Sequence, residues 1–380
     1  MHRIADTFGP IPYVNYGSSS LYDALDLVYN KFFEELDNAI EVLSNYVNGN
    51  VDAKLMSDYD CVYGGDVEKW VKFANTLRLR LAIRVSYANP TLAEAQAKKS
   101  MENMFGFIES KAERAELSHN SLEYHHPLHE IAYNFNSGDC RPGATIVAYL
   151  NGLNDSRISS YFTAADDGEY HGVRIGITTS NMSNYQGNKI SNLNINRAST
   201  PVVWMTAAES FFLRAEGALR GWDMGGTAKS FYEQGVRMSF EENNAAGVDD
   251  YLADHTSTPG AFADNVGSDN YTFSSRVTPA WDDNAGFEAQ LERIITQKWI
   301  ANYPDGPEGW SEYRRTGYPE VIPVVRNSSN GTIDTQLQVR RLPYTRDEKI
   351  NNASGVASGI SALGGQDTGG TKLWWDKKSR

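Results

Sequence analysis

The chain has 380 residues, 41% of them hydrophobic, and a mean hydropathy of −0.49, which favours a soluble, globular protein large enough to bury a sizeable core. No stretch approaches the roughly 18 consecutive apolar residues of a membrane-spanning helix. The formal net charge of −13 at pH 7 repels phosphate backbones, and no basic stretch interleaved with aromatic residues offsets it, so no nucleic-acid partner is expected.

The first predicted element is a long amphipathic helix over about 21–46. Its apolar side chains recur every three or four residues and therefore share one face. The turn-forming run Asn48-Gly49-Asn50 ends this helix.

A second helix is predicted over about 67–87, with an apolar face and with basic residues elsewhere. The basic side chains are Lys72, Arg78, Arg80 and Arg84. Asn89-Pro90 ends this helix. Thr91 and Glu94 have the spacing of a capping box, which predicts a third helix that ends near Phe105.

Two further helices are predicted over about 204–221 and 227–243, separated by the turn residues Gly225 and Gly226. Both mix small side chains with bulky ones, which lets two helices approach closely. This pattern is typical of tetratricopeptide-like helical hairpins, although no clean repeat of about 34 residues is present.

The stretch from Glu292 to Pro323 is the most informative part of the chain. A helix from Phe287 places its apolar residues on one face and stops at Pro304, Gly306 and Pro307. A second short helix follows, which carries Trp310, Glu312, Arg314 and Arg315.

Long polar stretches separate these helical blocks. The stretches 118–201 and 247–279 are rich in Asn, Ser, Gly and Asp with scattered aromatic residues, which is typical of structured loops that carry binding sites. The tail 321–380 is expected to be irregular. We interpret 1–380 as one domain, with helical blocks over about 21–106, 203–243 and 286–317.

Four stretches, taken in series, resemble one known family. They are Asp6 to Tyr13 (DTFGPIPY), Trp204 to Trp222, Gln297 to Pro319 (with QKWIA, EGW and RRTGYP), and Arg340 to Asp376. In this order and spacing they resemble the SusD-like (SusD/RagB) outer-membrane lipoproteins. The resemblance implies an all-α, tetratricopeptide-like helical superhelix with long irregular loop insertions.

The resemblance also implies a function and a location. Members of the family are non-catalytic binders of oligosaccharide or another nutrient, which they pass to a SusC-like TonB-dependent transporter on which the helical face docks. They are anchored by lipid to the outer membrane and face outward. Here Met1 stands five residues before Asp6, with no apolar leader and no Cys before Cys61, so we interpret the sequence as an N-terminally truncated form without its anchor.

Five loop aromatic residues are the candidate ligand-binding residues, because flat rings stack on sugar faces. They are Tyr251, Tyr271, Trp281, Tyr170 and Tyr185. Family members often bind glycans through the loops before the closing helix, which favours the first three. Packing is the alternative role for each ring, and Trp281 also suits a hydrophobic staple for the helix from Phe287.

No cofactor, catalytic residue or metal site is assigned. Pro127 breaks the helical spacing that a zinc site would need among His125, His126 and His129. No acidic cluster has the spacing of an EF-hand, but calcium binding by a loop is left open. The sequence leaves open whether Cys61 and Cys140 form a disulfide or remain two unpaired thiols. No hydrolase, phosphate-binding or nicotinamide motif is present.

Two other functions fit the same composition. An all-helical glycoside hydrolase is also acidic and rich in aromatic residues, and it would degrade polysaccharides. A helical protein-binding scaffold would capture a protein partner and no glycan. We expect a non-enzymatic binding protein.

Overall fold

Helices form the framework of the structure, a computed structural model that describes residues 1–50, 52, 54–117, 126–135, 140–177, 179–197, 199–264, 267 and 269–379. The α-helices are α1 (His2–Phe8), α2 (Leu25–Gly49), α3 (Val67–Arg84), α4 (Pro90–Glu102), α5 (Pro127–His129), α6 (Ala144–Gly152), α7 (Ile158–Tyr161), α8 (Ala207–Leu219), α9 (Ala228–Glu242), α10 (Val248–Leu252), α11 (Phe287–Ala301), α12 (Gly306–Thr316), α13 (Arg346–Asn351) and α14 (Ala353–Leu363). The all-α, tetratricopeptide-like prediction is confirmed.

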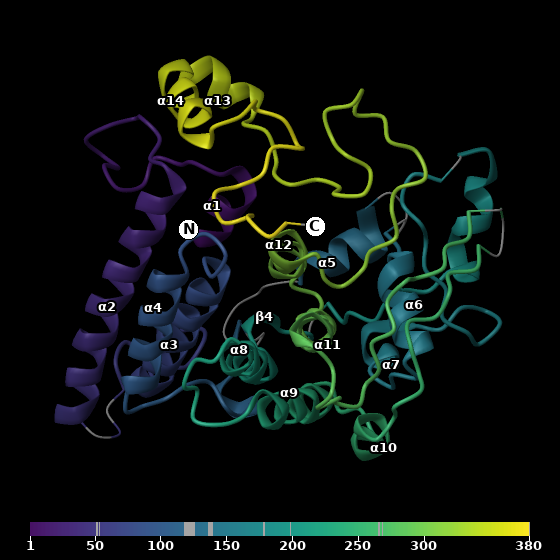
Figure 1. Cartoon of the computed structure of the whole chain (residues 1–380), viewed down its shortest axis with the longest axis horizontal. Helices are drawn as coiled ribbons and strands as arrows, with labels where there is room; N and C mark the ends of the chain where they lie inside the picture. Colours follow the sequence, from purple (N-terminus) through teal and green to yellow (C-terminus); the bar gives the residue numbers. More distant parts are fainter. Residues whose placement is uncertain are drawn as a thin grey trace.

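Helical hairpins pack side by side through the middle of the molecule (Figure 1). Helix α3 contacts α2, α4 and α8, while α11 contacts both α8 and α9. Figure 1 shows α2 at one side of this array, α6 and α7 at the other, and α13 and α14 above it. Among the described residues, no helix combines the length and the apolar composition needed to cross a membrane.

Short strands and single helical turns tie the loops to this framework. Strand β1 (Ala115–Leu117) pairs antiparallel with β4 (Val202–Met205), and β2 (Phe162–Thr163) pairs antiparallel with β3 (Asn192–Leu193). The shorter helical turns are η1 (Lys111–Glu113), the π-helical η3 (Glu130–Asn134), η5 (Thr179–Tyr185) and η6 (Gly187–Lys189).

Two local predictions are wrong. Helix α4 begins at Pro90 and is capped by Asn89, whose side chain accepts a hydrogen bond from Leu92 N, so Thr91 and Glu94 form no capping box. The tail 321–380 is not irregular throughout, because it contains α13 and α14. Gly359 in α14 packs closely against the Tyr22 ring. A Cβ at this position would lie only 2.6 Å from that ring, so a larger residue would clash.

The three arginines of α3, Arg78, Arg80 and Arg84, are buried, which the sequence pattern did not indicate. Arg84 donates to Glu312 Oε1 at 2.9 Å and to Glu308 Oε2 at 2.6 Å, and Arg80 is paired with Glu209. This buried ion network joins α3, α8, α11 and α12; its members are Arg80, Arg84, Lys298, Arg315, Glu209, Glu216, Glu308 and Glu312.

The two ends of the chain meet at Asp6. Its carboxylate accepts hydrogen bonds from Tyr29 Oη at 2.6 Å and from the indole of Trp375 at 2.8 Å. Arg314 in α12 donates to the Asp6 carbonyl at 2.6 Å. Gly9, at a φ of +94°, turns the chain away after α1, where an L side chain would be strained. The DTFG and RRTG motifs are therefore parts of one junction.

Candidate functional site

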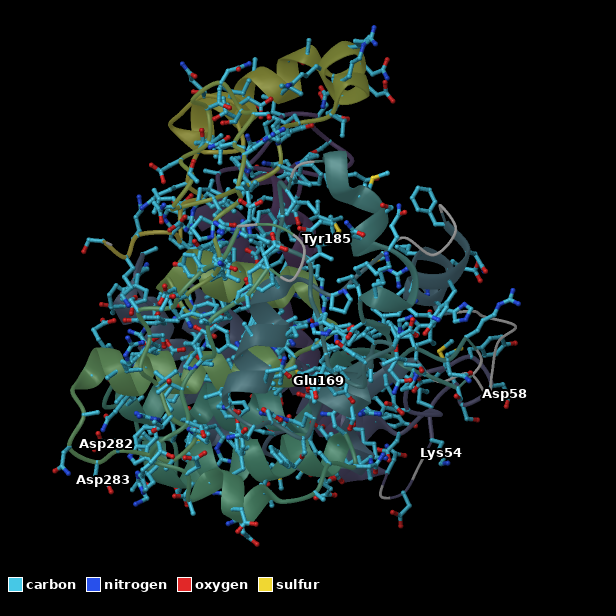
Figure 2. The ribbon with its side chains drawn as sticks, turned by 90° about the vertical axis from the view of Figure 1, so that its right-hand side faces the viewer. Lys54, Asp58, Glu169, Tyr185, Asp282 and Asp283 are labelled. Atoms are coloured by element: carbon cyan, nitrogen blue, oxygen red, sulfur yellow. The ribbon has the colours of Figure 1, made fainter. Side chains whose placement is uncertain are left out.

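Loops and short helices around α6 and α7 form a recess that two of the five predicted residues share. We call it the loop recess; its volume is about 240 Å³ and its polar and aromatic lining residues are Asn151, Glu169, Tyr170, His171, Tyr185, Phe262 and Asp264. In Figure 2, Glu169 and Tyr185 lie near the middle of the view, whereas Asp282 and Asp283 lie at its edge.

Hydrogen bonds fix the walls of the loop recess. Tyr185 Oη donates to Asp264 Oδ1 at 2.8 Å, and Asn151 Nδ2 donates to the Tyr170 carbonyl at 3.1 Å. Burial and the neighbouring Asp264 carboxylate raise the pKa of Tyr185 to about 12, so its hydroxyl keeps its proton at neutral pH. Tyr170 is only half-buried and is the ring of this pair that a ligand can reach.

The loop recess continues into a second hollow of about 490 Å³, with which it shares His171 and Ile190. Asp166, Asp167, Asn184 and Lys189 line this part. His171 Nε2 lies 2.7 Å from Asp167 Oδ2, and this hydrogen bond lowers the pKa of the Asp167 carboxyl. Amide, carboxylate and ammonium groups thus line the hollow that adjoins the loop recess, which suits hydroxyl-rich ligands.

Tyr271 lies in a different place, a shallow recess of about 600 Å³ that Tyr318, Glu292 and Glu320 also line. Its hydroxyl donates to Glu320 Oε1 at 2.8 Å, and the same carboxylate accepts from the backbone N–H of Ser274 and Ser275. The structure therefore separates Tyr271 from Tyr170 and Tyr185. An isolated antiparallel β-bridge joins Phe262 to Tyr271. This bridge lies between the two recesses, because Phe262 lines the loop recess and Tyr271 lines the shallow one.

Tyr251 and Trp281 pack inside the protein. Tyr251 is 5% exposed, its ring centroid lies 5.1 Å from that of Phe240, and its hydroxyl accepts a hydrogen bond from Gln297 at 2.7 Å. Trp281 is 7% exposed and its ring lies 5.3 Å from the Tyr232 ring. Neither ring offers a free face of the size that sugar stacking needs, so a role for them in binding stays a prediction.

The histidine cluster shows no metal-binding arrangement in the part of the chain that the structure covers. His126 caps α5 by accepting from Leu128 N, and the His129 ring stacks on Tyr133 at 4.7 Å, while His125 lies outside the described residues. Within the described ranges, no group of three or more His, Cys, Asp or Glu side chains is placed to hold a metal ion. Cys61 and Cys140 are not joined by a disulfide.

Sequence reasoning did not identify Asn151 and Asp264 as neighbours of the predicted tyrosines. They come from α6 and from the loop before Tyr271, more than 100 positions apart, and only the fold brings them together. The apolar run of α6 was the one available signal, because it marks a buried helix inside a polar stretch.

Comparison with known proteins gives consistent matches. Residues 1–376 match the family described as SusD-like, Susd and RagB outer membrane lipoprotein. A chitin-binding SusD homolog from Flavobacterium johnsoniae is 42% identical with a TM-score of 0.94, over 100% of this chain and 79% of that one. A SusD homolog from Bacteroides uniformis is 43% identical with a TM-score of 0.91, over 100% and 79%. No curated protein sequence matches the chain.

Proposed function

The chain belongs to the SusD-like family of outer-membrane lipoproteins, and from this premise we propose that it is a non-catalytic glycan-binding protein of the outer membrane. In this proposal it holds an oligosaccharide on its outward face and passes it to a SusC-like TonB-dependent transporter. The helical face packs against the transporter and the loops carry the glycan.

The loop recess is the observation that carries the proposal. Tyr170 offers a ring face, while Asn151, His171 and Glu169 offer hydrogen-bonding groups around it. Sugars are bound by this combination, since the ring covers the apolar face of the sugar and the polar groups pair with its hydroxyls. Each such contact in water contributes little, so affinity should be modest.

Isothermal titration calorimetry with a panel of oligosaccharides tests the proposal. Chitin oligosaccharides come first, because a protein of similar structure is described as chitin-binding. Tyr170→Ala should weaken binding about tenfold, since a stacked ring contributes about 0.5–1.5 kcal/mol beyond its buried area. Circular dichroism checks that the variant is folded.

Two matched variants locate the site. Tyr59→Ala removes an exposed ring from the connection between α2 and α3, far from the loops, and should leave affinity unchanged. Tyr271→Ala with Trp281→Ala tests the other predicted residues. If only the Tyr271→Ala, Trp281→Ala double variant weakens binding, the glycan lies in the Tyr271 recess. If no glycan binds the parent protein, or if the protein hydrolyses polysaccharide, the proposed function is wrong.

A further inference from the structure

Carboxylates dominate the charged groups of the loop recess and of the hollow that adjoins it. Glu169 and Asp264 line the recess, and Asp166 and Asp167 line the hollow. Among the described residues of the two linings, Lys189 is the one Lys or Arg, so with His171 neutral their formal charge is −3. A ligand here meets a negative field, which favours a cation and opposes an anion.

Two of these four carboxylates are free to bind a ligand. Asp167 Oδ2 lies 2.7 Å from His171 Nε2, and Asp264 Oδ1 accepts from Tyr185 Oη at 2.8 Å. Asp166 and Glu169 are exposed, and within the described ranges their carboxylates make no hydrogen bond or ion pair. A ligand can therefore contact these two groups without breaking an interaction of the protein.

A tight turn fixes the backbone between the two free carboxylates. Ala165 N donates to the Glu169 carbonyl at 2.8 Å, and Gly168 N donates to the Ala165 carbonyl at 3.0 Å. Asp166 N donates to the Asn188 carbonyl at 2.8 Å, which joins the turn to η6. Because the backbone is already ordered, a ligand that engages these side chains restricts only their rotation.

The one arginine of the 162–190 segment does not neutralise this charge. Arg174 donates from Nε to the Pro323 carbonyl at 3.1 Å, and from Nη1 to the carbonyls of Asp269 at 2.8 Å and Asn270 at 3.0 Å. Its guanidinium lies 5.6 Å from the centre of the Tyr271 ring, so it belongs to the other recess. The negative charge around Tyr170 therefore stays in excess.

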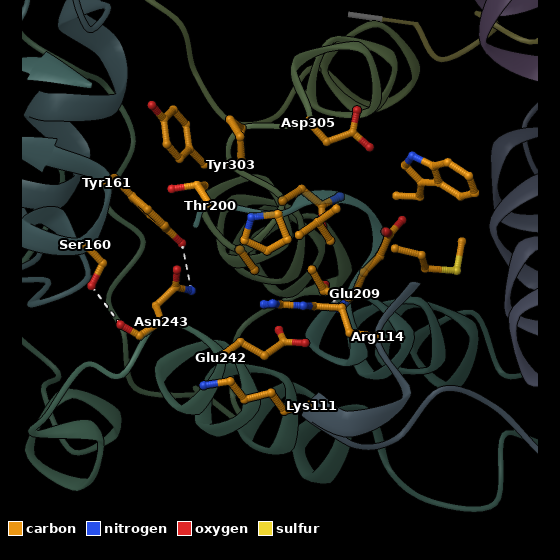
Figure 3. A pocket seen from close by; sticks show the side chains of 18 of the residues that line it. Lys111, Arg114, Ser160, Tyr161, Thr200, Glu209, Glu242, Asn243, Tyr303 and Asp305 are labelled. Atoms are coloured by element: carbon orange, nitrogen blue, oxygen red, sulfur yellow. Dashed lines mark hydrogen bonds between the residues drawn. The ribbon is translucent and has the colours of Figure 1, made fainter. Parts of the chain in front are cut away.

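A separate cavity of about 310 Å³ shows the opposite arrangement (Figure 3). The carboxylates of Glu209, Glu242 and Asp305 line it, and each has a partner inside the protein. Arg80 donates to Glu209 at 2.8 Å, Arg3 donates to Asp305 at 2.9 Å, and Ala207 N donates to Glu242 at 2.9 Å. Those charges serve the framework, whereas the charges of Asp166 and Glu169 are available to a ligand.

We propose that the loop recess prefers saccharides that carry ammonium groups, such as oligomers of glucosamine, and disfavours saccharides that carry carboxylate or sulfate. Asp166 and Glu169 are the specificity-determining residues, because each can accept a charge-assisted hydrogen bond from an ammonium group. This inference rests on the proposed function, which supplies the saccharide and the ring of Tyr170, and it adds the charge of the saccharide.

The test compares three β-1,4-linked trisaccharides of different charge by calorimetry: tri-glucosamine, cellotriose, and the trimer of glucuronic acid. At about pH 6 the amines of tri-glucosamine are protonated. At low ionic strength it should bind about five- to tenfold more tightly than cellotriose, and the glucuronic acid trimer should bind several-fold more weakly. About 1 M NaCl should remove most of these differences, because charges are then screened beyond about 3 Å.

Asp166→Asn with Glu169→Gln removes the two free charges and keeps the shape of the side chains. The ratio of the affinities for tri-glucosamine and cellotriose should fall to about one in this variant. Glu41→Gln with Asp58→Asn is the matched control, since both residues are exposed and Figure 2 shows Asp58 at the edge of the view. The control removes the same number of charges and should keep the preference. Circular dichroism checks that both variants are folded.

Several outcomes refute this inference and leave the proposed function standing. Equal binding of tri-glucosamine and cellotriose by the parent is one, and tighter binding of the glucuronic acid trimer is another. An unchanged ratio in the recess variant, or an equal loss in the control, would also refute it. So would binding of another glycan of the panel when tri-glucosamine does not bind. Failure of the whole glycan panel refutes the proposed function itself.

Discussion

Individual residues of the family motifs serve the interior of the protein. Glu216 is an example, since burial would raise its pKa but Arg315 and Arg220 hold the pKa at about 2, and the carboxylate stays charged inside the protein. Arg314 and Arg315 of the RRTG motif are likewise buried. The sequence pattern that identifies the family therefore reports how its helices are joined, and it carries no information on the ligand.

Replacing Arg84 by Met should lower the free energy of unfolding by about 3–5 kcal/mol, because Glu308 and Glu312 then lose a buried partner. Urea denaturation followed by circular dichroism measures this change. Lys98→Met, which removes an exposed partner of Glu102, is the control and should change stability by less than about 0.5 kcal/mol. Similar losses in the two variants would mean that the buried network contributes little.

Glu242 should make stability depend on pH in an unusual direction. Burial raises the pKa of its carboxyl from 4.5 to about 7. Between these values the folded state keeps a proton that the unfolded state has released, so this group lowers stability as pH rises through the window. Above pH 7 the cost is about 3 kcal/mol.

Glu242→Gln keeps the acceptor for Ala207 N and removes the titration. Relative to the parent, the variant should gain stability from pH 4.5 to pH 7 and keep that gain at higher pH. Denaturation at a series of pH values checks it, with the exposed Glu102→Gln as the control. A difference that does not vary with pH would contradict the raised pKa.

At the scale of elements, the long helices were predictable and the short ones were not. The prediction of 227–243 agrees with Ala228–Glu242, because its apolar spacing follows the helical period over four turns. Helix α6 is buried on nearly all sides and shows no period. The burial of Arg80 and Arg84 in α3 was also missed, since their partners Glu209 and Glu312 lie more than 100 positions away in α8 and α12.

The pairing of α8 with α9 depends on Gly235. A Cβ at this position would lie 2.8 Å from the Phe212 ring, which is fully buried and has no room to move. Gly235→Ala should therefore destabilise the protein by about 1–3 kcal/mol, although Ala is the better helix former by about 1 kcal/mol. Thermal denaturation measures the change.

Gly286→Ala is the matched substitution for this test. Gly286 precedes α11, and nothing lies within 4 Å of a Cβ built there. Because Gly286 is the N-cap of α11, where Gly is preferred to Ala, the substitution should cost about 0.5–1 kcal/mol from the cap alone and nothing from a steric clash. A stabilised Gly235→Ala variant would show that the helices can separate without loss.

At the scale of the whole molecule, the sites are products of assembly. The loop recess takes residues from α6, from the 169–190 region and from the loop before Tyr271. Aromatic composition therefore identified Tyr170 as a candidate, but it could not distinguish this half-buried ring from the buried rings of Tyr185, Tyr251 and Trp281. Exposure of a ring is a property of the folded chain, and it has no local sequence pattern.

The contact between the chain ends makes a prediction about unfolding. Trp375 is fully buried and donates to Asp6, so the C-terminal tail is held by α1, and α12 is bound to both through Arg314. A single domain over 1–380 should then unfold in one transition. Tryptophan fluorescence and far-ultraviolet circular dichroism should give the same midpoint, because tryptophans occur from Trp70 to Trp375.

Trp375→Ala should lower that midpoint for both probes together, by about 3–5 kcal/mol in free energy of unfolding. The substitution leaves an empty space where the ring was and removes one of the two side-chain hydrogen bonds to the Asp6 carboxylate. Its effect extends to α3, because the Arg84 guanidinium lies 5.4 Å from the centre of the same indole. Two separate transitions in the parent would divide the chain into independent units. A variant in which only one probe shifts would show that the tail unfolds without the helical framework.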